Sequence, residues 1–352
     1  METKKNNPFN ITFGEEPENF IPRQAAIDQI TASFDSDNPE TKVYIITGPR
    51  GSGKTVLLTH IKNIYENKKD WITVNLNPYG DMVEQLCASV YEKGKVKHLF
   101  LKTEFSFSFK GIGFSIQGDT PVSNVETLSE KIMAYLKKKG IKILVAIDDV
   151  VKNDNTQYFI HAYQSYIREK YNLYLLMTGL YENISNLEND KGLTFFVRAP
   201  KLYLEKLSQI AIANSYQRLL DVDKETSIQL SKITMGYAYG YQLLGNLLYK
   251  NNRILNQELL ETYDLTLEDN VYSLIWNNLS KKDKTILIAI AEGHTSVNEI
   301  LSATGINNST LQVYKTRLAK AGLIDIQTRG QITLSLPRLK EYVLMKKEFE
   351  DD

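Results

Sequence analysis

One eight-residue segment restricts the fold of this chain more than any other feature. It reads Gly48-Pro49-Arg50-Gly51-Ser52-Gly53-Lys54-Thr55 and fits the pattern G-x-x-x-x-G-K-[ST]. An apolar run over residues 43–47 precedes it, and a helical pattern over residues 54–67 follows it. Glycines let successive backbone N–H groups turn inward around phosphate oxygens, and the start of a helix adds positive potential. This context predicts a phosphate site for ATP, in which Lys54 reaches the β- and γ-phosphates and the Thr55 hydroxyl holds Mg²⁺.

A second polar site is expected where another buried strand ends. Residues 143–147 form an apolar run, and Asp148 and Asp149 follow it directly. We expect Asp148 to bind Mg²⁺ through water and Asp149 to orient the attacking water. A strand that ends in an acidic turn is common, so this prediction depends on the phosphate loop that comes earlier in the chain.

Apolar runs alternate with helical patterns over the first part of the chain. Strands are predicted at residues 43–47, 71–75, 143–147 and 173–177, and helices at residues 21–34, 54–67, 81–93, 125–139 and 156–170. Such alternation is typical of an α/β fold with a parallel sheet and helices on both faces. The segment before Phe20 is polar and is predicted to be loosely ordered.

Residues 103–118 interrupt this alternation. Three phenylalanines alternate with serines over residues 105–109, and the pattern predicts a β-hairpin around residues 111–113. Two roles for this insertion stay open. Its phenylalanine face packs on the sheet, or it faces a partner or DNA together with Lys102 and Lys110.

The pattern changes after about residue 205. We predict a P-loop α/β domain over residues 15–205, a helical lid over residues 206–279 and a third domain over residues 280–345. In the third domain, two helices around a glycine turn and a β-hairpin predict a winged helix-turn-helix. Its recognition helix would be residues 308–321. The candidate DNA-contacting side chains are Asn308, Ser309, Thr310, Gln312 and Lys315, with Arg329 at the tip of the wing.

Charge alone does not decide whether this domain binds DNA. The chain has 42 Lys and Arg and 42 Asp and Glu, so no overall basic field points to nucleic acid or membrane. Residues 281–343 carry nine Lys and Arg against five Asp and Glu, a modest local excess. Three interpretations stay open: sequence-specific reading of double-stranded DNA, non-specific duplex contact, and no DNA role.

The order of these motifs resembles the AAA+ and STAND ATPases over most of residues 15–345. It is most similar to bacterial and archaeal ATP-binding proteins related to initiator (origin-recognition) ATPases. The resemblance implies that Thr178 stands at the sensor 1 position, where its hydroxyl bonds the γ-phosphate or the water. It also implies that Arg198 acts as a finger towards the nucleotide of a neighbouring subunit. The alternatives are a capping or turn role for Thr178 and a surface ion pair for Arg198.

Two further motifs of that family have partial counterparts. Ile21-Pro22-Arg23 resembles the opening Val-Gly-Arg, which implies that Pro22 and Arg23 bind the nucleotide near its adenine. Residues 236–239 read Gly-Tyr-Ala-Tyr and resemble a Gly-x-Pro motif whose proline packs near the base, although Ala238 replaces the proline. AAA+ motors usually carry Asp-Glu where this chain has Asp-Asp, and the shorter second side chain favours slow ATP hydrolysis, with ATP acting as a state-setting ligand.

Two function classes therefore stay open. The first is an AAA+-like ATPase switch that is DNA-associated and forms a homo-oligomer in its ATP state, with ADP as product. The second is a STAND-type signalling ATPase with a protein partner and a structural winged helix; the absence of a repeat array after residue 345 favours the first. A third class is a nucleotide-dependent effector in a mobile element or defence system, and only the neighbouring genes could test it. The single cysteine, the polar N-terminus and the absence of a long apolar run predict a cytoplasmic protein without a membrane segment.

Overall fold

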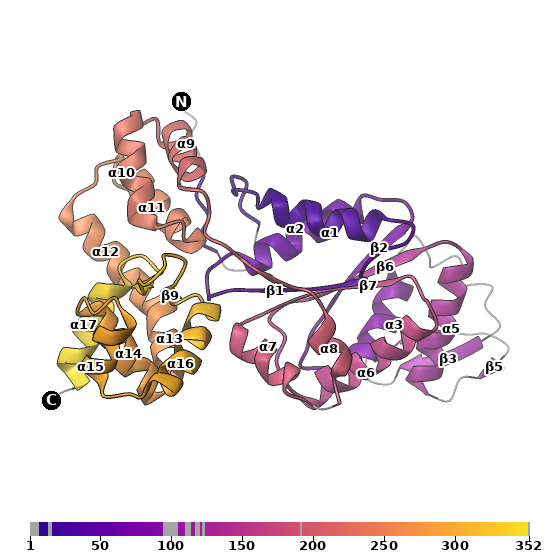
Figure 1. The fold of residues 1–352 in the computed structure, drawn as a ribbon. Coiled ribbons are helices and arrows are strands. Elements are labelled where there is room, and N and C mark those ends of the chain that lie inside the picture. Colours follow the sequence, from indigo (N-terminus) through magenta and orange to yellow (C-terminus); the bar gives the residue numbers. More distant parts are fainter. Residues whose placement is uncertain are drawn as a thin grey trace, which may run out of the picture. The chain divides into compact units, whose positions relative to one another are not determined.

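The computed structural model describes residues 7–12, 16–93, 105–109, 114–116, 120–121, 124–190 and 192–350. The chain divides into two compact units (Figure 1). The first unit comprises Met1–Pro22, Gly48–Gly53 and Tyr203–Asp352, and the second comprises Arg23–Thr47 and Lys54–Leu202.

A five-stranded sheet with the order β2-β6-β7-β1-β8 is the centre of the second unit. Its strands are β1 (Val43–Thr47), β2 (Trp71–Leu76), β6 (Lys142–Ile147), β7 (Leu173–Gly179) and β8 (Lys201–Tyr203). The pairs β2–β6, β6–β7 and β7–β1 are parallel, as the sequence predicts. In the register, Ile147 lies opposite Met177 and Thr47 lies opposite Gly179, so β6, β7 and β1 end at one edge of the sheet.

Helices cover both faces of this sheet (Figure 1). They are α1 (Gln24–Asp35), α2 (Lys54–Glu66), α3 (Met82–Glu92), α5 (Val125–Lys138), α6 (Asp154–Arg168), α7 (Tyr181–Glu188) and α8 (Thr194–Arg198). Side chains alternate across a strand, and in β1 Val43 and Ile45 join the core under α3, α5 and α6, whereas Tyr44 contacts Phe34 of α1. Burial on both faces explains why these strands are continuous apolar runs.

The first unit is mainly helical, and its core runs through all of its elements. These are α9 (Gln209–Leu220), α10 (Lys224–Thr234), α11 (Ala238–Lys250), α12 (Gln257–Leu267), α13 (Ser273–Asn278), α14 (Lys281–Ala291), α15 (Val297–Thr304), α16 (Asn308–Lys320) and α17 (Leu339–Glu350), with the antiparallel pair β9 (Ile324–Asp325) and β10 (Thr333–Leu334). A π-helical turn, η1 (Glu268–Tyr272), joins α12 to α13. The sequence analysis predicted a helical lid over residues 206–279 but neither this π-helical turn nor α17.

The N-terminal segment corrects one expectation. Phe9 is only 2% exposed and packs its ring against Tyr216 and Tyr241. The Asn246 side chain donates a hydrogen bond to the Phe9 carbonyl at 3.0 Å. The prediction of a loosely ordered start is therefore wrong for residues 7–12, because one buried aromatic ring holds an otherwise polar segment.

The predicted hairpin insertion is present in part. β3 (Phe105–Phe109) pairs with β4 (Phe114–Ile116) in the antiparallel sense and with β5 (Thr120–Pro121) in parallel. The predicted turn at residues 111–113, together with Lys102 and Lys110, lies outside the described residues. Within the described part of the chain, no helix combines the length and apolarity needed to cross a membrane.

Candidate functional site

Three side chains of the second unit meet at the carboxyl edge of the sheet. Asp148 follows β6, Thr178 lies near the end of β7, and Thr55 is the second residue of α2. The Thr55 hydroxyl donates to Asp148 Oδ2 at 2.8 Å, and the Thr178 hydroxyl donates to Asp148 Oδ1. Both carboxylate oxygens of Asp148 are therefore held by hydroxyl groups that the sequence analysis had placed at one site.

Asp149 completes this group, and we call Thr55, Asp148, Asp149 and Thr178 the acid cluster. Asp149 has a left-handed backbone (φ 55°), which aspartate tolerates better than most residues. Its backbone N–H donates to the Thr178 hydroxyl at 2.9 Å, and the Val150 N–H donates to the Thr178 carbonyl at 2.8 Å. The hydroxyl and the carbonyl of Thr178 thus both hold the turn that follows β6. The Asp149 side chain is exposed.

The donor atoms of the acid cluster fit Mg²⁺. The Thr55 hydroxyl and an Asp148 carboxylate oxygen are hard oxygen ligands that already lie 2.8 Å apart. Among the described residues, no group of three or more His, Cys, Asp or Glu side chains forms a dedicated metal cage. Thr55 and Asp148 would be enough protein ligands for Mg²⁺, which commonly uses one or two protein oxygens and completes its shell with water and phosphate.

The predicted phosphate loop has an unusual backbone. Gly51 and Gly53 both have positive φ angles, 72° and 90°. The Ser52 N–H donates to the Pro49 carbonyl at 3.2 Å, which closes a tight turn. Glycine adopts positive φ without the steric cost that a side chain adds, so these two positions have a local reason to be glycine. Lys54, which begins α2, is only 8% exposed.

Two tyrosines of the first unit hold this loop, and we call Tyr237 and Tyr239 the tyrosine anchors. The Tyr237 hydroxyl donates to the Arg50 carbonyl at 2.7 Å. The Tyr239 backbone N–H donates to the Gly51 carbonyl at 3.0 Å. The Tyr239 hydroxyl in turn accepts a hydrogen bond from the Asn270 side chain at 2.9 Å. The sequence analysis placed residues 236–239 near a nucleotide base but did not find these contacts with the loop carbonyls.

The sequence analysis also assigned Pro22, Arg23 and Arg198 to the nucleotide site. Pro22 is exposed. Arg23 precedes α1 without a side-chain capping bond, and burial lowers the pKa of its guanidinium to about 10. Arg198 ends α8, and its exposed side chain makes no ion pair with a described residue. The structure therefore brings the acid cluster together, whereas Arg198 lies exposed at the end of α8.

The candidate DNA-contacting residues lie on α16 and the β9–β10 hairpin. Asn308, Ser309 and Arg329 are exposed, whereas Thr310, Gln312 and Lys315 are partly buried. Ser309 donates to the Asn307 side chain at 2.8 Å, and Gln312 donates to Asn308 at 3.1 Å.

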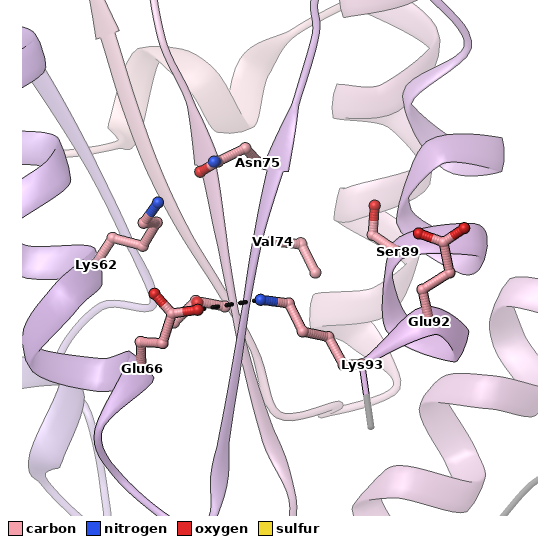
Figure 2. Close-up of a pocket in the computed structure, with 8 residues that line it drawn as sticks. Lys62, Glu66, Val74, Asn75, Ser89, Glu92 and Lys93 are labelled. Atoms are coloured by element: carbon pink, nitrogen blue, oxygen red, sulfur yellow. Dashed lines mark hydrogen bonds and ion pairs between the residues drawn. The ribbon is translucent and has the colours of Figure 1, made fainter. Parts of the chain in front are cut away.

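A cavity of about 420 Å³ lies beside β2 (Figure 2). It is lined by Lys62, Glu66, Thr73, Val74, Asn75, Ser89, Glu92 and Lys93, and the ion pair between Lys93 and Glu66 (3.1 Å) spans it. Lys62 lies eight residues after Lys54 on α2, which is about 12 Å along a helix. None of the predicted site residues lines this cavity, so it is not the phosphate site.

Comparisons with known proteins agree with this architecture. Residues 20–186 match the model of an ATPase domain found predominantly in Archaea, and residues 269–343 match a domain of unknown function. No curated protein matches the sequence.

Solved structures of similar fold include three archaeal proteins at 14% identity. A Walker-type ATPase of Pyrococcus abyssi superposes with a TM-score of 0.63 over 93% of this chain and 97% of its own. The ORC2 protein of Aeropyrum pernix, solved in ADPNP–ADP complexes, gives 0.55 over 94% and 97%. The Cdc6p protein of Pyrobaculum aerophilum gives 0.50 over 97% and 97%. At this identity the likeness shows the fold alone: a P-loop ATPase-like parallel sheet with flanking helices.

Proposed function

We propose that the protein is an AAA+-like ATPase of the Cdc6/ORC type that binds ATP and Mg²⁺ and hydrolyses ATP slowly. The observation that carries this proposal is the hydrogen bond between Thr55 and Asp148. It joins the residue that ends the loop motif to the acid that follows β6, and these are the two groups that hold Mg²⁺ in P-loop ATPases. The match of residues 20–186 to an ATPase domain supports the same proposal.

Each residue of the site has a proposed role. Backbone N–H groups of the loop and the Lys54 ammonium bind the phosphates, and Thr55 and Asp148 hold Mg²⁺, which neutralises charge on the phosphates when bound. Asp149 orients the attacking water, and its exposed carboxylate is accessible to it. Pro22 and Arg23 contact the adenine side. Because Asp149 is one methylene shorter than glutamate, it holds the water less closely and turnover is slow.

The test of ATP binding uses two lysines of one helix. Lys54→Ala removes the phosphate-binding ammonium, and Lys62→Ala removes a lysine eight residues further along α2. In calorimetry with ATP and ADP, we expect Lys54→Ala to abolish measurable binding and Lys62→Ala to leave it unchanged. Unchanged ATP affinity in Lys54→Ala would contradict the proposal.

Arg198 is proposed as the finger that completes the site of a neighbouring subunit. Its exposed guanidinium, unpaired among the described residues, supports this role. Only ATP offers a γ-phosphate to this charge, so ATP and not ADP should favour self-association. We expect Arg198→Ala to lower turnover and ATP-dependent association together, with an unchanged melting temperature. Sedimentation that is identical for both proteins in ATP and in ADP would remove the finger role.

DNA association is proposed through the C-terminal elements. The succession α14, α15, α16 and the β9–β10 hairpin is consistent with a winged helix, in which α16 would be the recognition helix and the hairpin the wing. The exposed side chains of Asn308, Ser309 and Arg329 support a contact with duplex DNA. Binding of the protein to duplex DNA with ATP, with ADP and without nucleotide, across a salt series, tests this association.

One contact favours the alternative, a STAND-type switch that acts on a protein partner. Gly322, which follows α16, lies so close to the loop that an added Cβ would be 2.6 Å from Pro49 Cδ. A C-terminal module that touches the phosphate loop suits a structural role in locking the nucleotide. No DNA binding in any nucleotide state, together with slower ADP release in wild type than in Gly322→Ala, would favour this alternative.

A further inference from the structure

We infer that Tyr237 and Tyr239 are positioning residues for phosphate binding, which hold two consecutive peptide groups of the loop so that the Gly51 N–H faces the anion. The inference rests on the proposed nucleotide function and adds residues that lie outside the loop motif. It concerns contacts within the first unit, to which residues 48–53 belong.

The planar trans peptide bond links the direction of each loop carbonyl to the direction of the next N–H. The chain has no cis peptide bond among its described residues, so each carbonyl points away from the next N–H across a rigid plane. Tyr237 fixes the Arg50 carbonyl, which turns the Gly51 N–H to the opposite side. Tyr239 fixes the Gly51 carbonyl, which turns the Ser52 N–H towards Pro49. The two anchors therefore set the direction of the two peptide planes on either side of Gly51.

The side of the loop that the tyrosines occupy carries the second step. An anion-binding loop gathers N–H groups on its inner side and directs carbonyls outward. Both tyrosine anchors contact carbonyls, so they lie on the outer side of the loop and not on the side that the Gly51 N–H faces. The contact is close, because a Cβ added to Gly51 would be 2.1 Å from the Tyr237 hydroxyl oxygen and 2.9 Å from Tyr239 Cβ. Only glycine fits at this position without displacing the anchors.

The environment keeps the anchors in the required state. Tyr237 is only 4% exposed, and burial raises the pKa of its hydroxyl well above the ordinary value, so the group stays a hydrogen-bond donor. Tyr239 is held in place by Asn270, which lies in the π-helical turn η1. Single π-turns often occur at functional positions in helices, and here the turn carries the residue that fixes an anchor.

The test removes one hydroxyl and compares it with a matched hydroxyl elsewhere. Tyr237→Phe deletes the donor to the Arg50 carbonyl. Tyr216→Phe deletes an equally buried donor, whose bond to the Tyr241 carbonyl has the same length of 2.7 Å. The measurements are melting temperature, amide hydrogen exchange of residues 48–53 without nucleotide, and calorimetric affinity for ADP and for pyrophosphate. Pyrophosphate serves as a probe that lacks the base and the sugar.

We expect Tyr237→Phe to weaken ADP and pyrophosphate by the same factor, about fivefold to tenfold, which corresponds to one net hydrogen bond. Exchange of the loop amides should become faster in this variant, and both properties should match wild type in Tyr216→Phe. Equal affinities in wild type and Tyr237→Phe would overturn the inference, as would a loss for ADP without a loss for pyrophosphate. If wild type binds neither ligand, the ATPase proposal itself fails, whereas wild-type binding with an unaffected Tyr237→Phe overturns the positioning role alone.

Discussion

The acid cluster and the phosphate loop are held by different kinds of contact. In the acid cluster, side chains hold side chains: the hydroxyls of Thr55 and Thr178 both donate to Asp148. In the loop, distant residues hold backbone carbonyls, and the Tyr237–Arg50 bond joins positions 187 residues apart. From this difference we infer that the two groups of contacts affect different steps of catalysis. Changes in the acid cluster should act mainly on turnover, and changes at the loop mainly on affinity.

The largest expected effect tests whether the acid cluster acts mainly on turnover. Asp149→Asn keeps the size of the side chain and the backbone bond to Thr178 but removes the water-orienting charge. We expect kcat to fall about a hundredfold, the low end for loss of a general base, with ATP affinity changed less than about twofold. Steady-state turnover and calorimetry measure the two quantities, and Asp154→Asn, an exposed acid on α6, is the control. A loss of affinity with turnover retained would mean that the roles of Asp148 and Asp149 are wrongly assigned.

The next prediction tests whether changes at the phosphate loop act mainly on nucleotide affinity. Gly51→Ala places a Cβ 2.1 Å from the Tyr237 hydroxyl oxygen on a backbone with φ 72°. We expect ADP affinity to fall about thirtyfold, from left-handed strain of about 1 kcal/mol plus the cost of moving the anchor. Gly140→Ala is the matched control, because it has φ 68° but no heavy atom within 4 Å of the added Cβ. Calorimetry with ADP separates the two variants, and equal affinities would show that the anchors do not constrain the loop.

The sequence revealed the acid cluster more fully than the loop contacts, for a physical reason. Buried parallel strands are continuous apolar runs, so β1, β6 and β7 could be placed, and Asp148 and Asp149 were found directly after β6. Thr178 came from the family resemblance. The family resemblance gave Thr178 a bond to the γ-phosphate or the water, which stays a prediction, and it did not indicate that the Thr178 hydroxyl donates to Asp148. A contact between a tyrosine and a backbone carbonyl leaves no pattern in the sequence, because every residue has a carbonyl. Phe9 was missed similarly, since one aromatic ring in a polar segment has no periodicity.

A smaller effect sharpens the role of Thr178 within the acid cluster. Thr178→Val keeps the shape of the side chain and removes the hydroxyl that bonds Asp148 and accepts the Asp149 N–H. We expect turnover to fall about tenfold and half-saturation to need more Mg²⁺, because two hydrogen bonds of about 1 kcal/mol each no longer hold the acids. Thr178→Ser restores the hydroxyl and should restore both properties. If Thr178→Val changed only the melting temperature, Thr178 would be a packing residue.

The smallest expected effect asks whether the unit that holds the tyrosine anchors also contacts DNA. Arg329 is exposed on the segment between β9 and β10, and Arg218 is exposed on α9 of the same unit. If Arg329 contacts a DNA phosphate, Arg329→Ala should reduce the slope of log affinity against log salt by about 0.9 and weaken binding about fivefold near physiological salt. Arg218→Ala removes the same charge from another helix and should leave the slope unchanged. Neither variant should alter ATP affinity or turnover, since neither residue belongs to the acid cluster or to the anchors.

Fluorescence anisotropy with a labelled duplex at several salt concentrations measures the slope. Equal slopes in both variants would place any DNA contact outside the hairpin, and an altered ATP affinity in Arg329→Ala would show that the hairpin acts on the phosphate loop instead.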